Sequence, residues 1–276
     1  MGHLLFYVSL LLTVLATAGF IVYLMKQQKP VYRWSYRLLL CGFLFHTLFL
    51  LQQYYVLGAT PVLSLKAALS FFSWAIVGAY LLFHMKFRLM VLGSFIAPLA
   101  ACLMIISSTI PAIEPSIHPT YRSLFLTFHV LTAFLGNGMF AIAFAAAIMY
   151  LILEHQIKRK RFGTFYGKLP SLETLDAINH HALTLGFTLY TIGMIIGAIY
   201  AHYALGSYWR WDGKEVWSLI TWLLYAVLLH GRLTVGWRGR RASILSVIAF
   251  AVLIFTFLGA SIWLSDYHSF KSLEGR

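Results

Sequence analysis

The sequence has few charged residues, and acidic residues are the scarcest. Of 276 residues 11% are charged, with 8 Asp and Glu against 21 Lys and Arg, whereas 61% are hydrophobic. A soluble domain carries about 25% charged residues. The composition therefore excludes an ordinary soluble domain and predicts an integral membrane protein.

Cysteine is nearly absent as well. Cys41 and Cys102 both fall inside apolar segments, and neither has a second cysteine nearby in the sequence. This excludes a dithiol redox motif and a cysteine-rich metal site. We expect both residues to be small buried hydrophobes, so any thiol that this protein handles must belong to another molecule.

Long apolar runs dominate the chain, and each is about long enough to cross a hydrocarbon core of roughly 30 Å as a helix. The first run is too long for a signal peptide and lacks a small-residue cleavage site, so we expect it to be retained as a span. The sequence predicts an all-α, polytopic fold with about eight transmembrane helices. The expected spans are 3–25, 38–57, 66–83, 89–110, 123–153, 181–204, 217–231 and 242–264.

The net charge of +13 is explained by topology and not by nucleic acid. Fifteen of the 21 basic residues lie in alternate connections, after the first, third, fifth and seventh spans. By the positive-inside rule these connections face the cytoplasm. Both termini then face outward, which gives an N-out/C-out protein of the cytoplasmic (inner) membrane. We expect the basic clusters to contact lipid headgroups.

The longest inward connection, 154–180, separates two four-helix groups. It contains Pro170 and Ser171 followed by acidic residues, which is typical of a helix start. We expect a short helix on the cytoplasmic surface leading into the sixth span. The interpretation divides the chain into an N-terminal membrane region, 1–110, and a second membrane domain, 111–276, with an outer loop at 205–216.

That outer loop carries an unusual set of side chains. Tyr208, Trp209, Trp211 and Trp217 are interleaved with charges that include Asp212. Aromatic residues are enriched at membrane interfaces in general, but such a belt does not explain the charges, which are costly near a membrane and tend to be functional or paired. The combination suits a large flat ligand with a polar edge, such as a porphyrin.

Two distant histidines are expected at the same membrane depth as this loop. His129 lies near the outer end of the fifth span and His268 lies just beyond the eighth. Two imidazoles can hold the iron of a porphyrin from both faces, although a lone interfacial histidine is more often a structural residue. Arg210, Lys214 or Arg122 are candidates to pair with the propionates.

Further histidines lie deeper in the predicted spans. His230 is at the inner end of the seventh span, His46 is near the middle of the second, and His84 ends the third. Each is also compatible with a hydrogen-bonded structural role. A second, inward haem site is possible, with His230 paired to His46, to His84 or to a histidine of another chain.

The segment from Gly206 to Trp217, with Trp222 and His230 after it, resembles the tryptophan-rich "WWD" signature of the CcsA/ResC-type proteins of cytochrome c assembly. The resemblance extends upstream to Phe128-His129-Val130 and downstream to His268-Ser269-Phe270, and it is weaker over 1–110. Leu205 and Gly213 depart from it, standing where the family usually has Trp and Pro.

The resemblance implies a role for each matching residue. His129 and His268 are the implied outer axial ligands of haem b, Trp209, Trp211 and Asp212 form the haem-binding loop, and His230 is an embedded ligand. The implied activity is that of the haem-delivering subunit of a cytochrome c synthase, with no catalytic residue of its own. It acts with a ResB/CcsB-type membrane partner and attaches haem to Cys-x-x-Cys-His motifs of apocytochrome c on the periplasmic side.

Two other functions stay open at this point. Around Pro61 the chain looks more like HemX-type relatives, which are tied to tetrapyrrole biosynthesis. A membrane haem-binding regulator without enzymatic activity is therefore the main alternative. A bis-histidine electron carrier that exchanges with quinone is the third.

Overall fold

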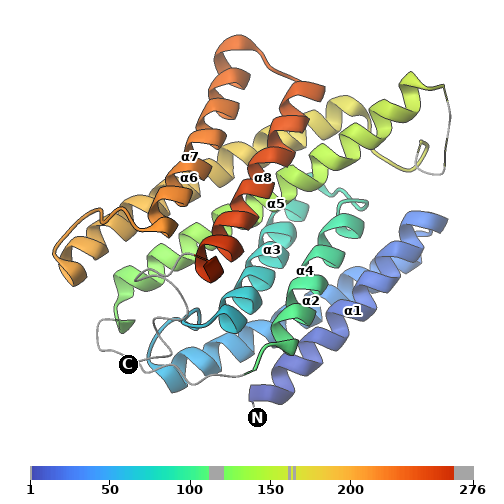
Figure 1. Cartoon of the computed structure of the whole chain (residues 1–276). Coiled ribbons are helices and arrows are strands. Elements are labelled where there is room, and N and C mark those ends of the chain that lie inside the picture. Colours follow the sequence, from blue (N-terminus) through green and yellow to red (C-terminus); the bar gives the residue numbers. More distant parts are fainter. Residues whose placement is uncertain (1, 112–120, 161–162, 164–165, 264–276) are drawn as a thin grey trace.

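The computed structural model describes residues 2–111, 121–160, 163 and 166–263, which form a bundle of eight α-helices (Figure 1). The helices are α1 (Gly2–Lys26), α2 (Lys29–Leu57), α3 (Leu65–Phe87), α4 (Gly93–Thr109), α5 (Leu124–Lys158), α6 (Leu172–Leu205), α7 (Gly213–His230) and α8 (Arg240–Trp263). A five-residue π-helix, η2 (Gly231–Val235), follows α7. The all-α prediction is confirmed.

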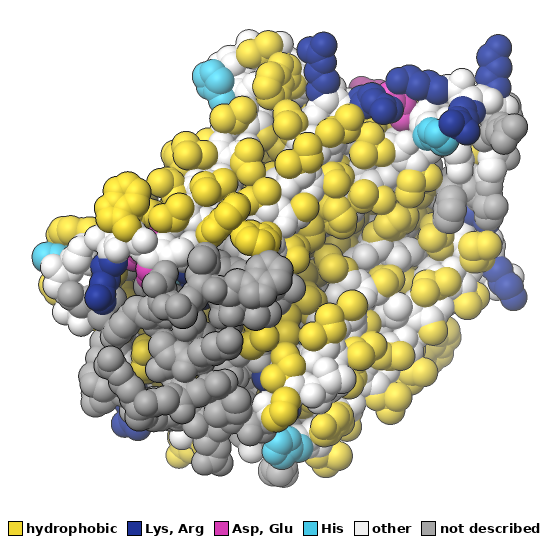
Figure 2. Space-filling view, viewed as in Figure 1, with side chains coloured by type: hydrophobic (Ala, Val, Ile, Leu, Met, Phe, Trp, Pro, Cys, Tyr) yellow, Lys and Arg dark blue, Asp and Glu magenta, His cyan; other side chains and the backbone are white. Residues whose placement is uncertain are grey.

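The lengths of the helices match a membrane. Within the described residues seven helices are long and apolar enough to cross one, and α4, with 17 residues, is the shorter exception. A span of 17 residues is at the short end of the range for transmembrane helices. Figure 2 shows hydrophobic side chains over the middle of one face and Lys and Arg gathered towards its upper end. The polytopic prediction is confirmed, while the N-out/C-out orientation stays a prediction.

Two helices begin earlier than the hydrophobic pattern indicates. α2 starts at Lys29, with Pro30 in its first turn, where proline is tolerated because the first amides have no helical partner. α6 runs unbroken from Leu172, capped by the Ser171 hydroxyl, to Leu205. The predicted helix start after Pro170 is confirmed, but the helix that begins there is not short, because it continues into the sixth span without a break.

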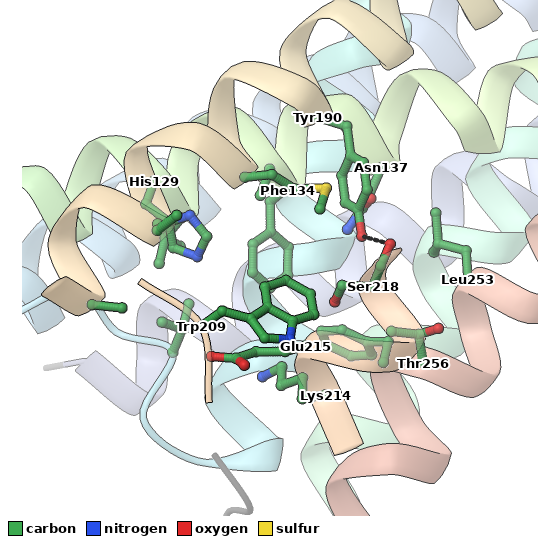
Figure 3. Close-up of a pocket in the computed structure, with 18 of the residues that line it drawn as sticks. His129, Phe134, Asn137, Tyr190, Trp209, Lys214, Glu215, Ser218, Leu253 and Thr256 are labelled. Atoms are coloured by element: carbon green, nitrogen blue, oxygen red, sulfur yellow. Dashed lines mark hydrogen bonds between the residues drawn. The ribbon is translucent and has the colours of Figure 1, made fainter. Parts of the chain in front are cut away.

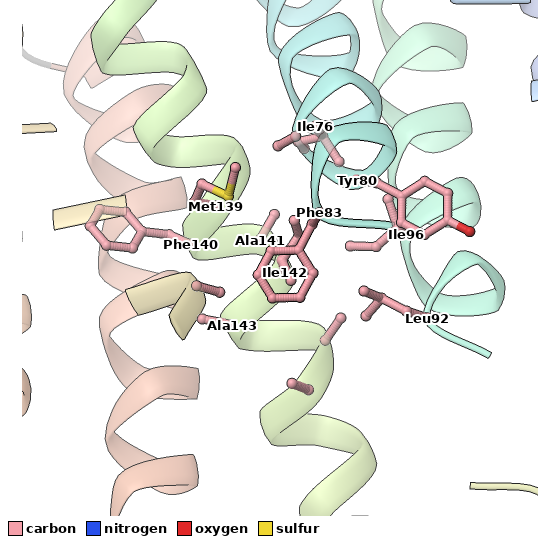
Figure 4. Close-up of a cluster of buried hydrophobic side chains, with 14 of the residues drawn as sticks. Ile76, Tyr80, Phe83, Leu92, Ile96, Met139, Phe140, Ala141, Ile142 and Ala143 are labelled. Atoms are coloured by element: carbon pink, nitrogen blue, oxygen red, sulfur yellow. The ribbon is translucent and has the colours of Figure 1, made fainter. Parts of the chain in front are cut away.

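α5 is the central helix and contacts α3, α6 and α8. Its small residues allow this: a Cβ on Gly138 would lie 2.7 Å from the Ala75 carbonyl oxygen of α3, and one on Gly136 would lie 2.9 Å from the Tyr190 amide of α6. Small residues at helix contacts are typical of membrane bundles. The buried core joins α3, α4 and α5 (Figure 4), while the division of the chain at residue 110 stays a prediction.

The two cysteines are not buried. Cys41 of α2 and Cys102 of α4 are both exposed on the outside of the bundle, so the prediction of burial is wrong. The reason is that an apolar residue in a membrane span is equally compatible with lipid and with the protein core.

Candidate functional site

The loop between α6 and α7 is a short, internally bonded turn. Gly206 ends α6 in the left-handed conformation, with φ +76°. Asp212 begins α7, and its Oδ1 accepts the Glu215 amide at 2.8 Å. The Glu215 carboxylate in turn accepts the Arg210 amide at 2.7 Å. An acidic N-cap followed three residues later by Glu is a capping arrangement that fixes a helix start.

Trp211 sets the directions of the loop's indoles. It has φ +61°, a left-handed conformation that a residue with a large side chain rarely adopts. Trp209 and Trp211 cross edge to face, with ring centroids 5.8 Å apart. The Trp211 side chain is 76% exposed, whereas Trp209 turns into the protein. The strained residue therefore separates an inward indole from an outward one.

Trp209 forms part of the lining of a cavity of about 260 Å³ between α5, α6, α7 and α8 (Figure 3). In Figure 3 its indole lies between His129 of α5 and Ser218 of α7. Aromatic and apolar side chains make most of the wall, with a few polar groups among them, as is usual for ligand sites. The lining includes His129, Ala133, Phe134, Asn137, Tyr190, Met194, Gly197, Tyr208, Trp209, Lys214, Glu215, Ser218, Leu253 and Thr256.

His129 is held across the α5–α6 interface. Its Nδ1 lies 2.7 Å from the carbonyl oxygen of Gly193. Because a carbonyl oxygen only accepts, Nδ1 must carry the proton, which leaves the lone pair of the neutral ring on Nε2. This is how metal-binding histidines are commonly oriented.

Gly197 provides the space for the His129 ring. A Cβ at Gly197 would lie 2.6 Å from both Cε1 and Nδ1 of that ring, a separation that no side-chain carbon tolerates. The imidazole therefore packs directly on the α6 backbone at Gly197, which lies one helical turn after Gly193, the residue that accepts its hydrogen bond.

Two buried polar atoms in the cavity wall have no hydrogen-bond partner among the residues that the structure describes. They are the indole Nε1 of Trp209 and the amide Oδ1 of Asn137, whose side chain is 9% exposed. A buried polar group without a partner is costly and calls for an explanation. An unpaired donor and an unpaired acceptor in one cavity are what a polar-edged ligand would satisfy.

The other loop residues that the sequence predicts as haem-binding do not all line the cavity. Asp212 is buried as the cap of α7, and Trp217 packs edge to face on Phe255, with centroids 4.6 Å apart. Tyr208 lines the cavity and stacks on His202 at 4.1 Å. Of the three candidate propionate partners, Lys214 is in the cavity wall, while Arg210 and Arg122 are exposed. Only part of the aromatic loop therefore faces the cavity.

The remaining predicted histidines are dispersed. His46 is buried and bonds the Ser70 hydroxyl at 2.9 Å, and His84 bonds Tyr32 at 2.7 Å. His230 is exposed at the end of α7. His268 lies outside the described residues, so its pairing with His129 stays a prediction. The structure thus gives His46 and His84 partners within the N-terminal helices.

Asn137, Tyr190 and Gly197 line the cavity and were not anticipated from the sequence. Asn137 offered a signal, since a polar amide within an alanine-rich span is unusual. It lies on the same face of α5 as His129 and Ala133, at helical spacing. Tyr190 and Gly197 offered none, because a tyrosine or glycine in a span is common.

The comparisons with known proteins agree on a family. The family described as "Cytochrome C assembly protein" matches residues 62–268. The cytochrome c biogenesis protein CcsA of Chlamydomonas reinhardtii is 34% identical over 235 residues, which cover 81% of this chain and 64% of that protein. The CcsA protein of Guillardia theta is 30% identical over 270 residues, covering 90% of this chain and 89% of its own length.

The fold has a counterpart among solved structures. The cytochrome c haem lyase CcmF superposes with a TM-score of 0.68 over 94% of this chain and 46% of its own, at 17% sequence identity. The chain thus spans under half the length of that lyase and 64% of the algal relative. With a family match over most of its length and relatives of the CcsA type, the chain belongs to the cytochrome c assembly protein family.

Proposed function

We propose that this chain binds haem b in the cavity beside Trp209 and presents it on the outer face of the cytoplasmic membrane. The observation that carries the proposal is the position of His129. Its Nδ1 is anchored on the Gly193 carbonyl in the wall of a cavity that also contains the unpaired Nε1 of Trp209. A fixed neutral imidazole beside an indole suits an iron porphyrin.

The types of side chain that line the cavity are suited to haem. Phe134, Trp209 and Tyr190 offer aromatic surface, and Lys214 offers a cation for a carboxylate. The volume of about 260 Å³ is below the usual range for sites that enclose a drug-sized ligand. We infer that the cavity takes part of the macrocycle and leaves the rest accessible, which is what transfer to another protein requires.

The bound haem would supply vinyl groups, across which a cysteine S–H adds to form a thioether without loss of any atom. The residues of this chain would bind and orient the haem, and His268 is the proposed second residue that would hold the iron. His230 is the proposed ligand of haem arriving within the membrane. Catalysis then comes from proximity and orientation. The thiols come from the Cys-x-x-Cys-His motif of apocytochrome c, since neither Cys41 nor Cys102 lines the cavity.

We also propose a ResB/CcsB-type membrane partner. The relatives of this chain that are named CcsA are cytochrome c biogenesis proteins. His230 is exposed at the end of α7, where a histidine of the partner could join it in holding haem. The chain would then be the haem-delivering subunit of a cytochrome c synthase. A HemX-like regulator of tetrapyrrole synthesis is the alternative outcome of the test.

The decisive experiment is a deletion strain scored by covalent haem staining of its c-type cytochromes, complemented with this chain. We expect staining to disappear on deletion and to return with the wild-type chain. Normal staining in the deletion strain, together with altered levels of glutamyl-tRNA reductase, would contradict the synthase proposal and favour the regulator.

A further inference from the structure

A second polar cluster lies far from the cavity, at the end of the bundle where α7 ends and α8 begins, called here the Arg232 end. Arg232 is 9% exposed. Its Nη2 lies 2.9 Å from Oδ2 of Asp176 in α6, and its Nη1 lies 3.1 Å from Oδ1. The pair is bidentate, which is the most directional form of a charge-assisted hydrogen bond.

The ion pair is surrounded by bonds that tie four elements together. Oδ1 of Asp176 also accepts the Gly239 amide, at 2.9 Å, just before α8. Nη1 of Arg232 also donates to Oδ1 of Asn179 at 3.3 Å, and the Asn179 amide nitrogen bonds the Ala143 carbonyl and the Ser246 hydroxyl. Every contact of the guanidinium therefore points towards α6, and α5, α6 and α8 share one network.

Arg232 is the second residue of the π-helix η2, which begins directly after His230. Successive helical residues are turned by about 100°, so residues two apart point to nearly opposite sides. With Arg232 anchored towards α6, His230 must point away from the bundle, and its side chain is exposed. The Thr234 hydroxyl also bonds the His230 carbonyl at 2.7 Å. Such π-turns are frequent at functional sites.

We propose that Asp176 and Arg232 are a positioning pair that holds His230 outward as a ligand for an iron porphyrin. The proposal rests on the role given to His230 under the proposed function. Neither residue touches the ligand, since both act by fixing the direction of the η2 turn.

The test uses the full-length protein in detergent. Asp176→Asn alone would leave Arg232 buried without its charge partner, so the double variant Asp176→Asn/Arg232→Gln, which removes both charges, is the main probe. Glu154→Gln is the matched control, because Glu154 joins a neighbouring ion-pair group whose partners, Lys158 and Arg240, lie outside η2.

Two readouts separate positioning from a general structural role. Hydrogen exchange of the haem-free protein should be faster at the amides of 231–236 in the double variant and unchanged in the control. Haem titration followed by the Soret band should show about 10- to 100-fold weaker binding at the His230 site, with added imidazole restoring the spectrum. Imidazole can replace a misdirected ligand, but it cannot restore a lost fold.

Unchanged exchange at 231–236 overturns the proposal. Unchanged haem binding in the double variant, while His230→Ala loses binding, also overturns it and leaves the proposed function intact. If His230→Ala itself keeps full haem binding, the ligand role of His230 and the positioning pair fail together.

Discussion

Within the α5–α8 group, the Asp176–Arg232 cluster and the cavity differ in how their buried polar atoms are paired. At the Arg232 end, Asp176, Arg232 and Asn179 satisfy one another with close hydrogen bonds. At the cavity, Trp209 Nε1 and Asn137 Oδ1 are buried and have no hydrogen-bond partner within the described part of the chain. A protein leaves buried polar atoms unpaired only at a cost. The difference indicates that the first cluster is complete within the protein, whereas a polar-edged ligand would complete the second.

The largest effect is expected from breaking the satisfied end. Asp176→Ala leaves the buried Arg232 side chain without its charge partner, which should lower the free energy of unfolding by about 3–5 kcal/mol. Glu154→Gln should cost less than about 1 kcal/mol, because its partners Lys158 and Arg240 are over half exposed. Thermal unfolding in detergent measures both. Equal losses would mean that the two networks do not differ as described.

His129→Ala tests the cavity end. We expect at least a 100-fold loss of haem affinity at the outer site, since changing a group that merely orients a ligand already costs about 10- to 100-fold. His155→Ala, an exposed histidine at the other end of the same helix, is the control. An unchanged Soret band on purified His129→Ala would reject this residue as a ligand.

Gly197→Ala should act on haem through His129. The added Cβ would lie 2.6 Å from the imidazole, so the ring must move at a cost of about 1–3 kcal/mol, which corresponds to about 5- to 150-fold in affinity. Gly167→Ala is the control, because its Cβ would meet nothing within 4 Å. In a double-mutant cycle the effect of Gly197→Ala should vanish in a His129→Ala background. A fully additive result would show that the two residues act separately.

The smallest effect compares the two indoles of the loop. Trp209→Phe keeps an aromatic ring, although a smaller one, and removes the unpaired Nε1, which should weaken haem binding by about 0.5–1.5 kcal/mol, up to tenfold. Trp211→Phe should leave the affinity unchanged, because that side chain is 76% exposed and does not line the cavity. Titration of both variants checks this, and a larger loss for Trp211 would place the ligand on the outside of the loop.

The fold could be predicted from the sequence to a large extent. Eight apolar runs correspond to the eight helices of the described chain, because in a membrane every backbone amide needs a partner within its own helix. The starts of α2 and α6 could not be read from hydropathy. Lys29, Arg33 and Asp176 interrupt the apolar pattern but continue the helix.

The sequence predicts which residues of the candidate site lie near one another, but not the directions of their side chains. Sequence places His129 and Trp209 at one membrane level, and the structure brings both into one cavity wall. The outward turn of Trp211 depends on one left-handed residue, which composition does not reveal. The Asp176–Arg232 pair joins residues 56 positions apart, and helix packing alone decides that they meet.

The bond from His129 Nδ1 to the Gly193 carbonyl has an electronic consequence. An imidazole that donates its second N–H to a carbonyl becomes more electron-rich and a stronger base towards metals. A ligand of that kind favours ferric over ferrous iron and lowers the midpoint reduction potential of the couple. The contact that orients the ring would therefore also make a bound iron harder to reduce, and a stronger electron donor would be needed to reduce it.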